Sequence, residues 1–157
     1  MRAKLPTGKG IWSAFWMLSA KRPLNWPTDG EIDIMENVGF DPSGVHANIH
    51  TGKFNHQIGT NKGDEYVLTT PSDEYHTYSI DWSPSYIKAY VDGINYFTYY
   101  KTDPSYGAWP FDTDFNIILN VAARGGWASL LGMDDSIYLT NYHIDHVRQY
   151  QNGHVKV

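Results

Sequence analysis

The feature that most constrains the fold of this chain is its alternation of short apolar runs with turn residues. Residues 76–82 place alternate apolar side chains on one face, which is the two-residue period of a half-buried strand. Residues 86–91 and 94–99 flank Asp92-Gly93, a pair typical of β-hairpin turns. No segment carries an amphipathic helical stripe over ten residues. These patterns predict an all-β fold, either a two-sheet sandwich or a barrel.

Three further runs complete the expected strands. Residues 11–18 are apolar on both faces and predict an inner strand. Residues 115–122 are mostly apolar and predict a central strand, and residues 142–150 predict a final one. The chain has 157 residues, with no internal repeat and no linker. We therefore expect a single domain over residues 1–157.

The composition excludes several classes of protein. The net charge is −5 without a basic cluster, which argues against nucleic acid and anionic membrane as partners. The absence of cysteine excludes disulfide scaffolds, thiolate zinc sites and cysteine nucleophiles. No apolar run approaches the roughly eighteen residues of a membrane span, and the first residues form no signal peptide. The chain is globular, and its 12 Tyr and 6 Trp are more than a core normally needs.

The most informative segment is acidic. In a regular strand, Glu31 and Asp33 would share one face, and Glu36 would lie among isoleucines on the other. An unpaired carboxylate in the core is very costly. A β-bulge near Ile34-Met35 would change the phase and bring Glu36 beside the other two carboxylates. The sequence therefore predicts a bulged strand with three carboxyl groups in a row.

Three like charges on one strand face destabilise one another and raise at least one pKa. The arrangement suits cleavage of a glycosidic bond, in which one carboxylate attacks and another donates a proton, about 5–5.5 Å apart in retaining enzymes. Two alternatives remain open at this point. One is a solvated acidic edge strand, and the other is a divalent metal site that includes His46, His50 and His56, although the spacing matches no dedicated ligand motif.

The segments around these carboxylates resemble glycoside hydrolase family 16. Residues 8–18 resemble the family's strand before the catalytic one, and residues 26–36 resemble its catalytic segment with the bulged pattern E-x-D-x-x-E. Four downstream segments follow in the expected order, namely residues 50–52, 90–93, 110–112 and 144–150. Within the family, the chain looks most like the laminarinases, which are endo-acting β-1,3-glucanases.

The resemblance implies a jelly-roll, concanavalin-like two-sheet sandwich with a sugar-binding cleft on its concave face. It implies a retaining double displacement, with Glu31 as nucleophile, Glu36 as general acid/base and Asp33 assisting Glu31. We accordingly expect Glu36 to have a raised pKa. No cofactor is needed for this chemistry, the partner would be a β-glucan polysaccharide, and a polymeric substrate implies secretion. Family domains carry further strands before Met1, so residues 1–157 would form a partial catalytic domain lacking its N-terminal strands.

Sugar-binding residues are also implied, because a flat aromatic ring packs against the apolar face of a pyranose. The candidates are Trp12, Trp16, Trp26, His50, Asn120 and Trp127. Trp12 and Trp16 lie four residues apart on one strand face, and core packing is their alternative role. His46 and His56 are expected to be ordinary surface or loop residues. Asp145 resembles an aspartate that ligates a structural calcium in many family members, and its alternative is a solvated strand carboxylate.

Two other functions compete with β-1,3-glucan hydrolysis. The first is hydrolysis of another polysaccharide within the family. The bulge argues against mixed-linkage lichenases, which resemble the unbulged pattern E-x-D-x-E, whereas agarases and carrageenases keep the bulge. No basic cluster that could bind sulfate stands near the motif. The second is a carbohydrate-binding module or a truncated inactive remnant, although a lectin would gain nothing from three repelling carboxylates.

Overall fold

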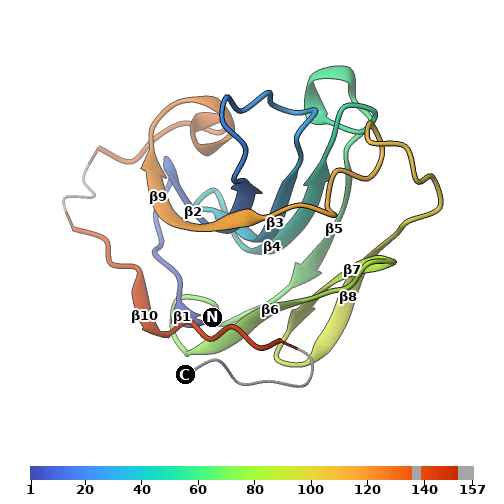
Figure 1. Ribbon diagram of the computed structural model, residues 1–157. Coiled ribbons are helices and arrows are strands. Elements are labelled where there is room, and N and C mark those ends of the chain that lie inside the picture. Colours follow the sequence, from blue (N-terminus) through green and yellow to red (C-terminus); the bar gives the residue numbers. More distant parts are fainter. Residues whose placement is uncertain (136–138, 152–157) are drawn as a thin grey trace.

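The computed structural model describes residues 1–135 and 139–151, and these form two stacked antiparallel sheets (Figure 1). The strands are β1 (Arg2–Lys4), β2 (Ile11–Ser19), β3 (Glu31–Val38), β4 (Asp41–His50), β5 (Lys62–Val67), β6 (His76–Trp82), β7 (Tyr86–Val91), β8 (Ile94–Tyr100), β9 (Phe115–Ala123) and β10 (His143–His146), and the 3₁₀ helices are η1 (His56–Ile58) and η2 (Gly126–Ser129). In this part of the chain, no helix is long and apolar enough to cross a membrane.

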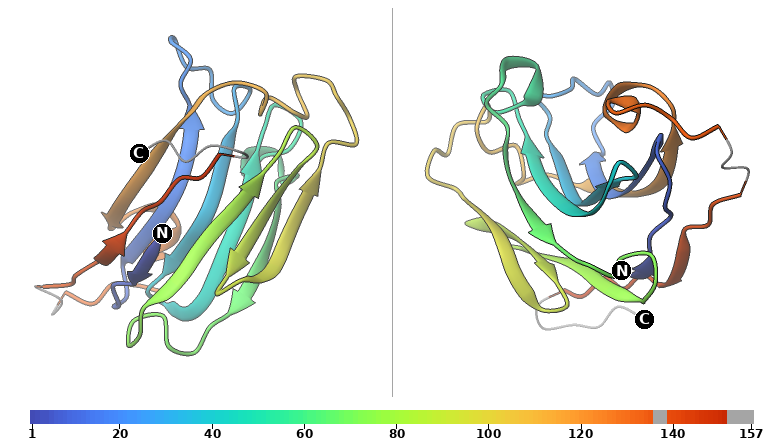
Figure 2. Two further views of the ribbon diagram at one scale, coloured as in Figure 1. Left: turned by 60° about the horizontal axis from the view of Figure 1, so that its bottom comes forward. Right: turned by 180° about the vertical axis from the view of Figure 1, so that it is seen from behind.

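The two layers are separated in the view from behind, on the right of Figure 2. One sheet has the strand order β5-β4-β3-β2-β9, and the other has the order β10-β1-β6-β7-β8. The predicted all-β two-sheet sandwich is therefore confirmed. The catalytic candidate β3 occupies the centre of the first sheet, with β2 and β4 hydrogen-bonded to its two sides.

The hairpin between β7 and β8 forms where the sequence predicts it. Asp92 and Gly93 have φ angles of 49° and 81°. Both values are positive, as a type I′ turn requires. Strand β6 pairs with β7 from Tyr78 opposite Val91 to Trp82 opposite Ile87, and its first two residues pair with β1. This meander supplies the sheet that covers the apolar side of β3.

The core lies between the sheets and contains the apolar side chains of β3. Ile32 and Ile34 are buried in one cluster with Val45 of β4 and with Tyr78 and Ala89 of the opposite sheet. Burial of large apolar side chains supplies most of the favourable free energy of such a sandwich. The opposite face of β3 is thereby left to its acidic side chains.

The register of β3 contains the predicted bulge. On β2, Phe15 pairs with Met35, and the next residue, Trp16, pairs with Asp33, so Ile34 has no partner there. The pairing of β3 with β4 also shifts between Asp33 and Glu36. Ile34 and Met35 are both buried, at 2% and 0% exposure. Two consecutive side chains thus enter the core, and Glu36 turns to the acidic face.

The final strand differs from the sequence prediction. Residues 142–150 were expected to be extended, but β10 covers only His143–His146. Its hydrogen-bonded partner is the three-residue strand β1, which limits the ladder it can form. Ile144 and Val147 are 39% and 38% exposed, so apolar burial does not extend the strand either.

Deletion of Met35 is expected to remove the bulge and to leave all three carboxyl groups on one face, because β3 would then alternate regularly against both neighbours. The variant should fold, with a free energy of unfolding lower by roughly 2–5 kcal/mol for the lost buried side chain. Denaturant unfolding measures this. Deletion of Ile32 is the matched control, because it turns Glu31 into the core and should abolish cooperative folding. Equal behaviour of the two deletions would contradict the assignment of the bulge.

Candidate active site

The acidic face of β3 forms the floor of a hollow of about 160 Å³. Its lining residues are Trp12, Ala14, Trp16, Glu31, Asp33, Glu36, Asn120 and Ala122. They come from the adjacent strands β3, β2 and β9, whose alternate residues face the same side because the strands are in register. The hollow thus brings together all three predicted carboxyl residues and three of the six predicted sugar-binding residues.

Glu36 is buried and held by two donors. The indole Nε1 of Trp12 donates to its Oε1 at 3.1 Å, and the amide of Asn48 donates to its Oε2 at 2.9 Å. Asn61 in turn donates to Oδ1 of Asn48 at 3.0 Å, which fixes the orientation of that amide. Burial raises the pKa of Glu36, while the bonds from Asn48 and Trp12 lower it. The net direction is upward, which confirms the raised pKa expected for this residue.

Glu31 stands at the other end of the row. The indole Nε1 of Trp26 donates to its Oε2 at 2.8 Å. Burial raises its pKa to about 7, the bond from Trp26 opposes this shift, and the charge of Glu36 adds to it. A hydrogen bond with Asp33 further lowers the pKa of Glu31. Glu31 therefore titrates near neutral pH and is stabilised as a carboxylate by donors on two sides.

Asp33 lies between the two glutamates and is 4% exposed. Burial raises its pKa well above the ordinary value, and the charges of Glu36 and Glu31 raise it further. Its hydrogen bond with Glu31 also raises its pKa. The same bond lowers the pKa of Glu31, so the two shifts have the directions expected when Asp33 is the donor and Glu31 the acceptor.

His50 contacts the same two carboxyl groups from β4. Its Nε2 lies 3.3 Å from Oδ2 of Asp33 and 3.8 Å from Oε1 of Glu31. Burial and the neighbouring His56 lower its pKa to about 4. The ring is therefore neutral at pH 7, and these contacts are not ion pairs. His50, Asp33 and Glu31 also form one of the clusters whose ligand atoms lie within 4.8 Å of one another, the geometry that a divalent ion would need.

The loop before β3 carries Trp26 back over Glu31. The buried carboxylate of Asp29 anchors this loop by accepting hydrogen bonds from the Asn25 backbone at 2.8 Å and from the Tyr106 hydroxyl at 2.6 Å. Gly30 follows with a φ angle of 90°, a conformation that favours glycine. The chain can then turn directly into β3 with Trp26 bonded to its first residue.

Aromatic rings stand at both ends of the carboxyl row. At the Glu31 end, Trp26 packs against His50 and His56, with ring centroids 6.1 Å and 5.3 Å away. At the Glu36 end, Trp127 meets Trp12 at 5.5 Å and His46 at 4.9 Å, both edge to face.

The expectation that His46 is an ordinary surface or loop residue is wrong, because it lies half-buried within β4 and contacts Trp127. Burial lowers its pKa. His56 is exposed in η1 but belongs to the ring cluster around Trp26.

The middle of the hollow contains a further side-chain bond. Nε1 of Trp16 donates to Oδ1 of Asn120 at 2.8 Å, which joins β2 to β9 across the floor. Trp12 and Trp16 thus line the hollow on one strand face, and neither is a core residue. Sequence reasoning missed Asn48 and Asn61. The signal for Asn48 was its position two residues before His50, which places it on the same face of β4.

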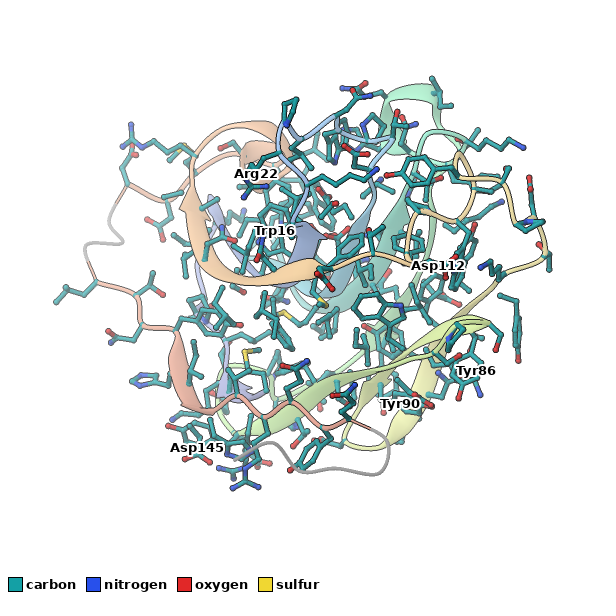
Figure 3. The ribbon with its side chains drawn as sticks, viewed as in Figure 1. Trp16, Arg22, Tyr86, Tyr90, Asp112 and Asp145 are labelled. Atoms are coloured by element: carbon teal, nitrogen blue, oxygen red, sulfur yellow. The ribbon has the colours of Figure 1, made fainter. Side chains whose placement is uncertain are left out.

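Asp145 lies far from the hollow, at the edge of the other sheet, whereas Trp16 stands in the first sheet (Figure 3). Its Oδ2 accepts a hydrogen bond from the Arg2 guanidinium and contacts the His146 ring, both at 3.1 Å. Asp145 belongs to neither cluster of potential metal ligands among the described residues. Within the described residues its carboxylate is paired with a guanidinium, and a calcium ion at Asp145 stays a prediction.

Comparison with known proteins identifies related chains. Residues 1–148 match the model of the family described as "Glycosyl hydrolases family 16". A β-glucanase of Rhodothermus marinus is 39% identical over 96% of this chain and 56% of that protein. A keratan-sulfate endo-1,4-β-galactosidase of Sphingobacterium multivorum is 32% identical over 96% of this chain and 36% of that protein.

The crystal structure of the Rhodothermus marinus laminarinase superposes with a TM-score of 0.86 at 38% identity. The superposition covers 90% of this chain and 59% of that one. This chain thus spans only 36% to 59% of the length of these related chains.

Replacement of Glu31 by Gln should stabilise the fold increasingly as the pH rises. The folded-state pKa of Glu31 is about 7, above its ordinary value, so the parent chain loses stability as this group ionises between about pH 4.5 and pH 7. The neutral amide has no such loss. We expect the variant's gain in unfolding free energy to be larger at pH 8 than at pH 4.5, by on the order of 2 kcal/mol.

Urea unfolding at the two pH values measures this difference. The exposed Glu74, replaced by Gln, is the matched control and should change stability equally at both. If Glu31→Gln raised the unfolding free energy equally at both pH values, Glu31 would not have the raised pKa of a buried carboxyl group.

Proposed function

The chain belongs to glycoside hydrolase family 16, and from this premise we propose that the protein is an endo-acting, retaining β-1,3-glucanase. The observation that carries the proposal is the pair of glutamates at the two ends of one strand face, each with its own hydrogen-bond donors and with the buried Asp33 between them. Two carboxyl groups with separate roles are what glycosidic bond cleavage needs.

The first step follows from the donors of each group. Glu31, which accepts bonds from Trp26 and Asp33, attacks the anomeric carbon and forms a glycosyl-enzyme ester. Glu36 gives its proton to the departing glycosidic oxygen as that bond breaks. In the second step Glu36 accepts a proton from water, the resulting hydroxide attacks the anomeric carbon, and Glu31 leaves as a carboxylate. Configuration is inverted twice and hence retained.

The aromatic rings support an endo mode of action. A chain that is cut internally needs sugar-binding surfaces on both sides of the scissile bond. Trp26 flanks the Glu31 end, and Trp12 with Trp127 flanks the Glu36 end. Flat rings of this kind bind the apolar face of a sugar.

Two features support β-glucan over a sulfated galactan as the substrate. The relative with the higher sequence identity is named a β-glucanase, whereas the keratan-sulfate enzyme is the more distant of the two. The side chains lining the hollow also include three carboxyl groups and no Lys or Arg, which sulfate groups would require. A polymeric glucan does not cross a membrane, so the proposed site of action is extracellular. The proposed steps use only the chain's own carboxyl groups, and a calcium ion at Asp145 is not part of the proposal.

The proposal predicts release of reducing sugar from soluble β-1,3-glucan by this chain. Glu31→Gln should abolish turnover while retaining oligosaccharide binding, because it removes the nucleophile and keeps the aromatic surfaces. Glu74→Gln is the control and should hydrolyse at the parent rate. Binding without turnover in the parent would identify a carbohydrate-binding protein. Release of sugar from a galactan in place of β-glucan would overturn the proposed substrate.

Asn48 is expected to set the upper pH limit of activity, because its amide bond favours the ionised form of Glu36. Asn48→Ala removes that bond and should raise the pKa of Glu36, so the alkaline limb of kcat/KM should move to higher pH. Asn61→Ala, which only frees the Asn48 amide, should shift it less in the same direction. The pH profiles of kcat/KM for the three proteins test this, and an alkaline limb that stays in place or moves down would contradict it.

A further inference from the structure

A second group of potential metal ligands lies at the Glu36 end of the cleft. It consists of Asp41 at the start of β4, His46 five residues further along, and Glu65 on the edge strand β5. His46 and Glu65 are direct cross-strand partners. One atom from each residue, Oδ2 of Asp41, Nε2 of His46 and Oε1 of Glu65, surrounds Gly44. The ligand atoms of the group lie within 4.8 Å of one another.

Gly44 is what allows this approach. A Cβ atom at that position would stand 2.7 Å from Oδ2 of Asp41 and 3.0 Å from both Oε1 of Glu65 and Nε2 of His46. Any larger residue would press the three side chains apart. The backbone at Gly44 is not in the left-handed region, so glycine is not required there for conformational reasons. The absence of a side chain at Gly44 leaves room for the three polar atoms to lie close together.

The three converging atoms are available to a ligand. Within the described residues, neither the ring of His46 nor the carboxylate of Glu65 has a hydrogen-bond partner in the protein. Asp41 receives only a long contact from the Ser43 hydroxyl, at 3.4 Å, on its other oxygen. Glu65 is exposed, whereas Asp41 and His46 are half-buried, so the group opens to solvent on one side. Two carboxylates that face each other there repel unless a cation lies between them.

We propose that Asp41, His46 and Glu65 bind a divalent transition metal of the zinc class, with water completing the coordination. One imidazole nitrogen and two carboxylate oxygens suit Zn²⁺, whereas Ca²⁺ and Mg²⁺ select sets of oxygen ligands. Zinc bonds of about 2.0–2.2 Å need the three atoms somewhat closer than they stand, so small rotations of these side chains would accompany binding.

The metal would connect three points on the neighbouring strands β4 and β5. It would join the start of β4 to its middle and to the edge strand β5, and it would fix the ring of His46, which packs against Trp127. Because the metal binds only the folded chain, it should raise thermal stability by mass action. This proposal stands apart from the proposed hydrolysis, since none of the three ligands belongs to the catalytic carboxyl row.

Isothermal titration calorimetry of the metal-free chain with ZnCl₂ tests the site, with the melting temperature as a second readout. The parent should bind one Zn²⁺ at this position and melt at a higher temperature with zinc. His46→Gln and Glu65→Gln should each weaken this binding by more than about tenfold, because even outer-shell partners of a bound metal are worth about 10- to 100-fold. Gly44→Ala keeps all three ligands and should also weaken it.

Two control variants distinguish zinc binding at the proposed site from zinc binding elsewhere on the chain. His143→Gln removes an exposed histidine on β10 and should bind as the parent does. Glu31→Gln disrupts the cluster of Glu31, Asp33 and His50 and should leave binding at the proposed site unchanged. Absence of zinc binding would overturn the proposal. So would affinity that survives His46→Gln and Glu65→Gln but falls with Glu31→Gln.

Discussion

The one extra residue in β3 determines the arrangement of the whole site. If the present sequence alternated regularly with no bulge, Glu36 would lie in the core, and Met35 would occupy its place on the floor of the hollow. The bulge also connects the site to the opposite sheet, because the Tyr96 hydroxyl on β8 donates to the carbonyl oxygen of Ile34 at 3.4 Å. A residue that breaks the regular ladder thus finds part of its hydrogen bonding across the sandwich. The position of the acidic row is thus fixed by the opposite sheet as well as by the strands that neighbour β3.

Burial raises the pKa of every carboxyl group in the row, and the hydrogen-bond donors around each group modify the size of that rise. Asp33 has its pKa raised well above the ordinary value by burial and by the charges of the two glutamates. Its hydrogen bond with Glu31 lowers the pKa of Glu31. Glu36 is held by the uncharged donors Trp12 and Asn48, which limit the rise of its pKa without forming an ion pair. The three carboxyl groups influence one another's pKa, so the row titrates as a unit.

The parts of this site that depend on local chain geometry could be predicted from the sequence. Glu31 and Glu36 are an odd number of residues apart, so a bulge was required to place them on one strand face, and β3 contains it. The Asp92-Gly93 turn required positive φ angles, and both residues have them. The parts that depend on pairing between distant strands could not. Asn48 is an ordinary polar residue until β4 is placed beside β3, when its amide meets Glu36. His46 was misjudged for the same reason, since only cross-strand pairing shows that it faces Trp127 and Glu65.

The support beneath the cleft decreases from the centre of the sheet toward β9. On β2, Phe15 is 5% exposed, whereas its partner Leu119 on β9 is 36% exposed on the same side of the sheet. The carboxyl groups stand on β3, where packing from below is complete. Asn120 stands on β9, where packing contributes less to its position. The hydrogen bond that Asn120 accepts from the Trp16 indole, at 2.8 Å, therefore fixes the Asn120 side chain at the edge of the sheet, as close packing fixes side chains at its centre. Close packing thus fixes the carboxyl groups of β3, where covalent bonds would be made and broken. A side-chain hydrogen bond fixes Asn120 on β9, where sugar would only be bound.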